Sequence, residues 1–211
     1  YHVFSRSIAK YVVFNNSKEY QRMQDILFLY RFSNLDYKYS QFTDLDLKLQ
    51  QDIIKNLQKD NSFLVEIVAY CLMPTHIHLL LRQIVDNGIS KYMSKVLNSY
   101  SRYFNIKHKR IGPLWSGRFK SVLVTKDEQL LHLTRYIHLN PISSNLVKKL
   151  EEWRYSSYSE YTNRKIQPKL CQFKHIIDMS PSEYKKFVLD RKSYQREINS
   201  IKNELIDNYT G

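Results

Sequence analysis

The sequence of 211 residues has few cysteines, few glycines and no long apolar run. Two cysteines, Cys71 and Cys171, are too few for a disulfide framework and predict a reduced, cytoplasmic protein. The four glycines form no glycine-rich loop of the kind that surrounds nucleotide phosphates. No stretch reaches the ~18 apolar residues that a membrane-spanning helix needs, so we expect no membrane partner.

Acidic residues are missing from one long segment. Between Asn87 and Lys126 the chain has no Asp or Glu, and its net charge as a whole is +13. This balance predicts a polyanionic partner, because Lys and Arg neutralise phosphates and aromatic rings stack on unpaired bases. The alternative is a solvated charged face above an aromatic core. The candidate nucleic-acid-binding residues are Arg102, Lys107, Lys109, Arg110, Trp115, Arg118 and Lys120.

Hydrophobic periodicity predicts strands that alternate with helices. The expected strands cover residues 1–8, 63–72, 76–83 and 116–124, and the expected helices cover residues 17–32, 42–58, 90–108 and 126–140. We expect the last of these helices to stop at Pro141, and a further helix to begin at Ser180 with a capping box to Glu183.

This order predicts an α+β fold with a ferredoxin-like antiparallel sheet and helices on one face. We expect a catalytic domain over residues 1–150 and a mostly helical accessory extension over residues 151–211.

Two histidines stand one residue apart in MPTHIHLLL, residues 73–81. Residues i and i+2 of a strand share a face, so His76 and His78 project from the same side while Ile77 faces the other. Such a pair can supply two ligands to one metal ion. The alternative is a pair of half-buried histidines hydrogen-bonded to the backbone.

The segment YIHLNP places Tyr136 and Asn140 four residues apart, one turn from each other on the same helical face. A phenol hydroxyl and an amide oxygen side by side can face a bound ion. The alternative is a half-buried tyrosine and an asparagine that ends a helix. His132 lies one turn earlier and is a candidate for removing the phenol proton, the alternative being a surface histidine.

The ordered motifs MPTHIHLLL, GRFKS and RYIHLNP resemble those of the REP-associated tyrosine transposases. These proteins form the insertion-sequence-200-like branch of the HUH single-strand endonucleases. The resemblance covers about residues 1 to 161, and it implies a ferredoxin-like or RRM-like fold.

The same resemblance implies a metal-dependent single-stranded DNA endonuclease and strand transferase that cleaves near hairpins through a 5′-phosphotyrosine intermediate. Tyr136 corresponds to the nucleophile, and His76, His78 and Asn140 correspond to the metal ligands. The implied cofactor is Mg²⁺ or Mn²⁺, and imidazole ligands favour Mn²⁺. The implied partner is single-stranded or hairpin DNA, bound by a monomer or a homodimer. A non-catalytic hairpin-binding protein on the same fold is the alternative.

Overall fold

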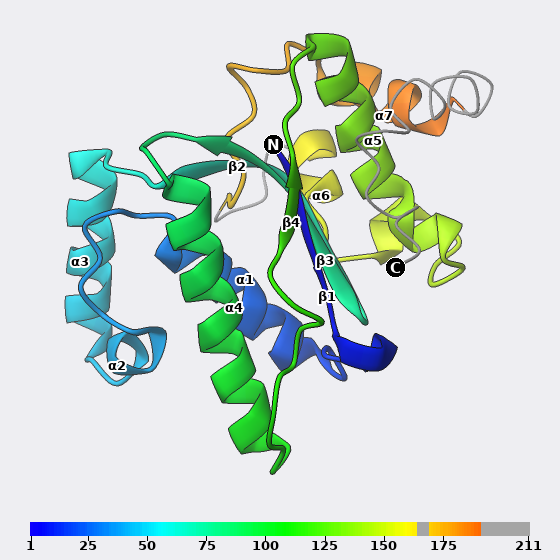
Figure 1. The fold of residues 1–211 in the computed structure, drawn as a ribbon. Helices are drawn as coiled ribbons and strands as arrows, with labels where there is room; N and C mark the ends of the chain where they lie inside the picture. The colour runs from blue at the N-terminus through cyan, green and yellow to red at the C-terminus, as the bar shows by residue number, and fades with distance from the viewer. Residues whose placement is uncertain (164–168, 191–211) are drawn as a thin grey trace.

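The computed structural model describes residues 1–163 and 169–190. Its centre is a four-stranded antiparallel sheet with the strand order β2-β3-β1-β4 (Figure 1). The strands are β1 (His2–Arg6), β2 (Val65–Met73), β3 (His76–Gln83) and β4 (Lys120–Val122). The expected α+β class with an antiparallel sheet is confirmed, and β3 spans the residues predicted for it.

The edge strand β4 is shorter than the predicted strand over residues 116–124. Gly117 has a φ of 146°, in the region that side chains disfavour, and the chain becomes a regular strand only from Lys120. Only three residues of β4 therefore pair with β1.

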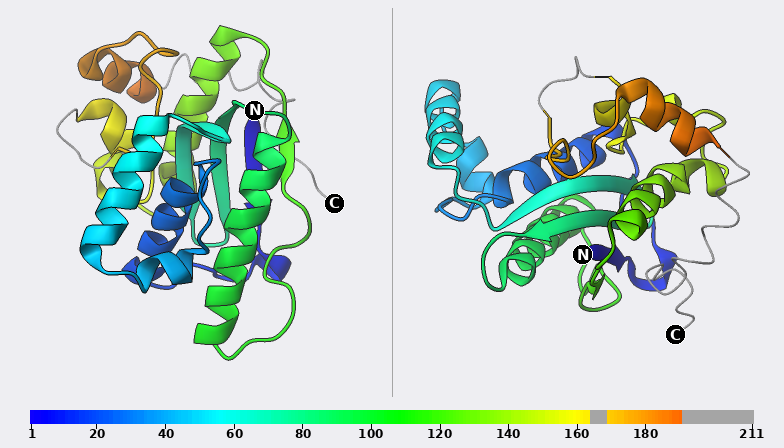
Figure 2. Two further views of the ribbon diagram at one scale, coloured as in Figure 1. Left: turned by 90° about the vertical axis from the view of Figure 1, so that its left-hand side faces the viewer. Right: turned by 90° about the horizontal axis from the view of Figure 1, so that it is seen from above.

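Helices lie on both faces of the sheet. α1 (Ser17–Tyr30) and α4 (Gly88–Lys107) contact each other in front of the sheet in the left view of Figure 2. α5 (Asp127–Ser143) packs on β2 and β3 from the other face (Figure 1). The expected placement of the helices on one face is therefore corrected. The reason is that β2 is buried along nearly its whole length and needs cover on both sides.

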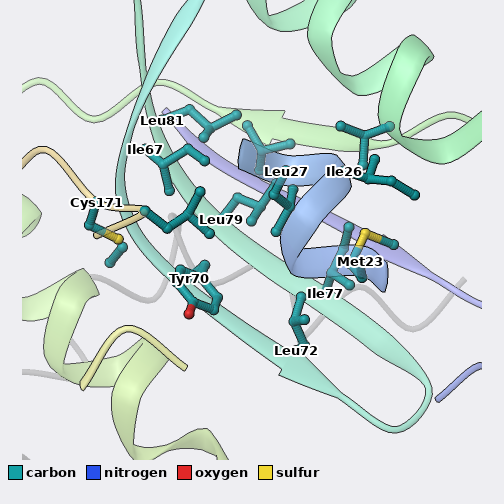
Figure 3. Packing of buried hydrophobic residues seen from close by; sticks show 14 of the residues in the cluster. Met23, Ile26, Leu27, Ile67, Tyr70, Leu72, Ile77, Leu79, Leu81 and Cys171 are labelled. Atoms are coloured by element: carbon teal, nitrogen blue, oxygen red, sulfur yellow. The ribbon is translucent and has the colours of Figure 1, made fainter. Parts of the chain in front are cut away.

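The strand β3 divides its side chains between these two layers. Ile77, Leu79 and Leu81 pack toward Met23 and Leu27 of α1 (Figure 3). The alternation of a strand then turns the intervening side chains, including both histidines, toward α5. The core on one face thus determines where the histidine pair lies.

Two helix boundaries differ from the predictions. The single helix expected over residues 42–58 is two helices, α2 (Tyr39–Thr43) and α3 (Leu47–Asp60). They are separate because Asp46 is extended and caps α3, accepting a hydrogen bond from the Leu49 amide.

The helix α5 continues through Pro141 to Ser143 rather than stopping at the proline. Proline removes one helical hydrogen bond, but the last turn is closed by bonds from Ser144 N to Asn140 O and from Leu146 N to Pro141 O. Pro141 is buried, so packing also holds this turn in place.

The described part of the expected extension packs on the same core. It contains the 3-10 turn η2 (Leu150–Glu152), α6 (Tyr158–Thr162) and α7 (Pro181–Leu189). The other 3-10 turn, η1 (Ile8–Lys10), lies near the N-terminus and follows β1. The hydrophobic core continues across residue 150 into α6 and α7. The predicted start of α7, with Ser180 as cap and its capping box to Glu183, is confirmed. The part of the expected extension over residues 191–211 lies outside the described residues.

Within residues 1–163 and 169–190, no helix combines the length and apolar character needed to cross a bilayer.

Gly88 lies where the start of α4 approaches the backbone before β2. A Cβ atom at this position would lie 2.2 Å from the carbonyl oxygen of Leu64. Gly88→Ala is therefore expected to lower the free energy of unfolding by about 2–3 kcal/mol, because backbone must move to make room. Urea denaturation measures this, with the exposed Ser90→Ala in the same turn as control. Equal stability of the two variants would contradict the close approach.

A buried carboxylate joins the start of α1 to the end of α4. Glu19 lies 2.7 Å from both Lys107 Nζ and His108 Nε2 and accepts a hydrogen bond from the Asn15 amide. Burial alone would raise the pKa of Glu19, but these hydrogen bonds lower it to about 2. The carboxylate is therefore held in its charged form in the folded protein.

Because the folded pKa of Glu19 is below its ordinary value, its stabilising contribution is complete above about pH 4.5 and is lost as the pH falls toward 2. Glu19→Gln is expected to lower the free energy of unfolding by about 2–3 kcal/mol at pH 7. The difference from wild type should shrink in urea denaturation at pH 3. A difference that stays the same at both pH values would refute the ionic role of Glu19.

Candidate active site

The histidine pair lies at the start of β3, on the face that α5 covers. The rings of His76 and His78 are edge to face, with centroids 4.9 Å apart. His78 is fully buried and His76 is half-buried. One imidazole is thus part of the protein interior, whereas its neighbour reaches toward solvent.

Hydrogen bonds hold both imidazoles in place. Thr75 Oγ1 lies 3.0 Å from His76 Nδ1, and His2 Nε2 lies 3.2 Å from His78 Nδ1. Burial first, and then electrostatic interactions with His76, His2 and Arg6, lower the pKa of His78 well below its ordinary value. His78 is therefore neutral at pH 7, the form in which imidazole binds metal ions.

His2 also belongs to this site, although it is not among the residues predicted from the sequence. It joins the site because β1 pairs with β3 in the register that sets Phe4 opposite His78. The rings of His2 and His78 stack with centroids 5.4 Å apart. The alternation of YHVFSR predicts a strand, but only its pairing with β3 shows that His2 lies next to His78.

Tyr136 of α5 lies against this histidine cluster in the same chain. Its ring stands edge-on to His78, with centroids 5.8 Å apart, and edge-on to His2 at 6.1 Å. The side chain is only partly buried. The structure therefore brings together the tyrosine and the two histidines that the sequence singled out.

Asn140 lies one turn after Tyr136 and is 8% exposed. Its Nδ2 donates a 3.0 Å hydrogen bond to the carbonyl oxygen of Tyr136, which leaves Oδ1 as the amide atom suited to bind a cation. In the part of the chain that the structure describes, no three His, Cys, Asp or Glu side chains are grouped to hold a metal ion. A metal ion at His76 and His78 would thus need oxygen ligands such as Asn140 Oδ1, the substrate phosphate or water.

His132 lies on the side of α5 that faces α7. Its ring packs on Phe187 with centroids 5.7 Å apart, and its Nε2 lies 3.9 Å from Glu128. These contacts are those of a packing residue. They give no support to a role for His132 in removing the phenol proton.

Contacts within the protein engage several of the candidate nucleic-acid-binding residues. Trp115 is 7% exposed and its Nε1 donates to the carbonyl oxygen of Leu97, so its ring is not open to a base. Arg110 donates to Asn105 Oδ1 and to the carbonyl oxygen of Pro113, which closes the loop after α4.

Lys107 is another of these residues, because it forms the ion pair with Glu19 described above. The remaining candidates have exposed side chains, and they are Arg102, Lys109, Arg118 and Lys120.

A buried hydrogen-bond network anchors the back of α5. His138 Nδ1 lies 2.7 Å from Tyr184 Oη, and His138 Nε2 lies 2.7 Å from Ser157 Oγ. Tyr184 Oη in turn donates to Thr134 Oγ1. Burial lowers the pKa of His138 to about 3, so the network forms around a neutral imidazole.

The neighbouring Arg135 is fully buried and ties α5 to the end of α7. It donates hydrogen bonds to the carbonyl oxygens of Val188 and Asp190, and its guanidinium lies over the Phe187 ring. The residues on either side of Tyr136 in the sequence thus fix the helix that carries it.

The sheet, the histidine pair and the helical tyrosine together define an α+β protein with a possible nucleophile beside two imidazoles. The family described as IS200-like transposases matches residues 33–140, about half of the chain, and this chain belongs to that family. The matched segment contains His76, His78, Tyr136 and Asn140.

Two relatives carry names of the same kind. A Haemophilus influenzae protein named as a REP-associated tyrosine transposase is 30% identical over 114 residues, which cover 49% of this chain and 64% of that protein. The Escherichia coli REP-associated tyrosine transposase is 22% identical over 136 residues, which cover 64% of this chain and 78% of that protein.

A solved structure of a REP-associated tyrosine transposase bound to a REP hairpin has the same fold. It superposes with a TM-score of 0.52 at 15% identity, covering 85% of this chain and 88% of the other.

The network behind α5 yields a matched pair of variants. Tyr184→Phe removes the hydroxyl that bonds His138 and Thr134 and is expected to lower the free energy of unfolding by about 1–3 kcal/mol. Tyr158→Phe removes a buried hydroxyl that has no hydrogen-bond partner among the described residues, so it should be neutral or stabilising. Urea denaturation compares the two, and equal effects would show that the network does not hold α5.

Proposed function

We propose that the protein is a metal-dependent single-stranded DNA endonuclease and strand transferase that cleaves near a hairpin and forms a 5′-phosphotyrosine intermediate. The observation that carries this proposal is the contact of the partly exposed Tyr136 with His78, beside His76, within one chain. The transposase names of the relatives support it, as does the hairpin bound to the similar structure.

His76 and His78 would hold the divalent cation, together with Oδ1 of Asn140. Their donor set suits Mn²⁺ better than Mg²⁺, because Mg²⁺ prefers oxygen ligands. A bound divalent ion polarises the non-bridging oxygens of a phosphodiester and neutralises the charge that develops there. The neutral state of His78 leaves its imidazole able to bind without first losing a proton.

The reaction proposed for Tyr136 exchanges one ester for another. Its phenolic oxygen loses its proton and bonds to phosphorus, while the bond from phosphorus to the 3′ oxygen breaks and that oxygen takes up a proton. The protein stays joined to the 5′ phosphate, and a free 3′ hydroxyl is released. Because the phosphotyrosine keeps the ester bond energy, a second 3′ hydroxyl can reverse the step and join a new strand.

Tyr136→Phe removes only the attacking oxygen and should leave folding and hairpin binding intact. With hairpin DNA labelled at its 3′ end and Mn²⁺ present, wild type is expected to form a covalent adduct that survives denaturing electrophoresis. The variant should form none, a loss of at least ~10³-fold in rate. The exposed Tyr11→Phe serves as control and should form adduct like wild type.

Two other results would overturn the proposal in different ways. Cleavage by wild type without any adduct would indicate hydrolysis by water, with Tyr136 as a structural residue. Binding without cleavage in wild type and variant alike would indicate a non-catalytic hairpin-binding protein.

A further inference from the structure

A groove of about 980 Å³ lies on the side of the molecule away from α5. Residues of α1, of the segment 35–41 at the start of α2 and of α4 line this groove. Figure 1 shows where these elements lie in the fold. None of its lining residues belongs to the site around Tyr136. The groove is therefore separate from the proposed catalytic centre.

The lining of this groove is strongly basic. One acidic residue, Asp36, takes part, and the cations of the lining are Arg22, Lys38, Lys95, Arg102 and Lys107. Lys107 is paired with Glu19, whereas Lys95 and Arg102 have exposed side chains on the outer side of α4. The surplus of positive charge favours an anionic occupant.

Arg22 supplies a buried donor to the groove. Its guanidinium lies 3.9 Å from the ring centroid of Tyr39 and 4.8 Å from that of Tyr103. Its Nε is buried and has no hydrogen-bond partner among the described residues. An unsatisfied buried donor is unfavourable, and a phosphate oxygen or a base carbonyl would satisfy it.

The aromatic wall is already fixed in place. Tyr30 Oη accepts a 2.8 Å hydrogen bond from the Tyr39 amide and donates to Ser99 Oγ on α4. Tyr39 Oη donates to Asp25. Next to this wall, Tyr37 is 38% exposed and its ring is open to stacking on a base.

We propose that this groove binds unpaired DNA nucleotides, with phosphates at Lys95 and Arg102 and bases on Tyr37 and Tyr103. A space of this size holds roughly two to three nucleotides. Cations spread along a groove beside the exposed ring of Tyr37 and the partly buried ring of Tyr103 fit a chain of phosphates and bases better than one isolated anion. The choice of DNA rests on the proposed function, whereas the charge and the rings indicate single-stranded nucleic acid in general.

The first test measures fluorescence anisotropy with a labelled six-residue oligo-dT, which forms no hairpin. Lys95→Glu combined with Arg102→Glu is expected to weaken binding by about 10- to 100-fold. The slope of the logarithm of the binding constant against the logarithm of the salt concentration should become shallower by about 1.4, the change for two lost phosphate contacts with a single strand. Lys48→Glu combined with Lys59→Glu makes the same change of charge on exposed positions of α3 outside the groove. This control should change binding by less than ~3-fold.

The second test locates the DNA directly. Full-length protein is irradiated with oligonucleotides that carry 5-iododeoxyuridine, and the cross-linked peptides are identified by mass spectrometry. Cross-links to Tyr37 or Tyr103 are expected, and Tyr37→Ala should weaken binding several-fold. Cross-links confined to the peptides around Tyr136, with both double variants equal in affinity, would overturn the groove proposal.

Two outcomes separate this proposal from that for Tyr136. If the groove variant binds DNA like the control while wild type still forms the Tyr136 adduct, the groove proposal fails alone. If oligo-dT binds through Lys95 and Arg102 but no adduct ever forms, the proposed catalysis fails and the groove stands. Equal binding of RNA would support single-stranded nucleic acid as the occupant of the groove but overturn the choice of DNA. Capture of a phosphopeptide but no oligonucleotide would overturn the groove proposal as a whole.

Discussion

The alternation of side chains along β3 determines how the site is assembled. Ile77, Leu79 and Leu81 are fixed in the core beneath α1, so His76 and His78 must lie on the opposite face of the sheet (Figure 3). A slip of one residue in the pairing of β3 would turn the aliphatic side chains toward α5 and the histidines into the core beneath α1. Hydrophobic burial on the opposite face of the sheet therefore supplies the free energy that fixes the register of β3 and the position of its histidines.

The opposite half of the site depends on how α5 is held. Arg135 and His138 flank Tyr136 in the sequence, yet they point into α6 and α7 and are fully buried there. Ser157 connects this network to β2, because its Oγ accepts a hydrogen bond from the Tyr70 amide and its own backbone amide donates to the Tyr70 carbonyl oxygen. The segment after residue 150 thus sets the distance between α5 and the sheet, and with it the contact between Tyr136 and His78.

Much of this arrangement follows from local patterns in the sequence. The extent of β3, the shared face of its histidines and the capping box of α7 each depend on a few neighbouring residues, and each could be predicted. Tyr136 was found in the same way, from its spacing on a helix. The resemblance to a known family added its role.

Tertiary partners decided the rest. His2 enters the site only through the pairing of β1 with β3, and Trp115 leaves the predicted DNA surface because its ring fits beneath α4. The sequence predicts Lys107 as a phosphate ligand, but in the structure it pairs with Glu19, which is far away in the sequence. The helices on both faces of the sheet and the groove beside Arg22 likewise depend on contacts between segments that are far apart in the sequence. No local pattern predicts such contacts.

The most direct test of the proposed active site is a crystal structure of the protein grown with Mn²⁺, in which anomalous scattering locates the ion. A single strong peak is expected between the imidazoles of His76 and His78, with Asn140 near it and the hydroxyl of Tyr136 from the same chain facing it. If no peak lies at the histidine pair and the Tyr136 hydroxyl is turned away from both imidazoles, the proposed active site is wrong. The sheet and its helices would then support DNA binding without catalysis.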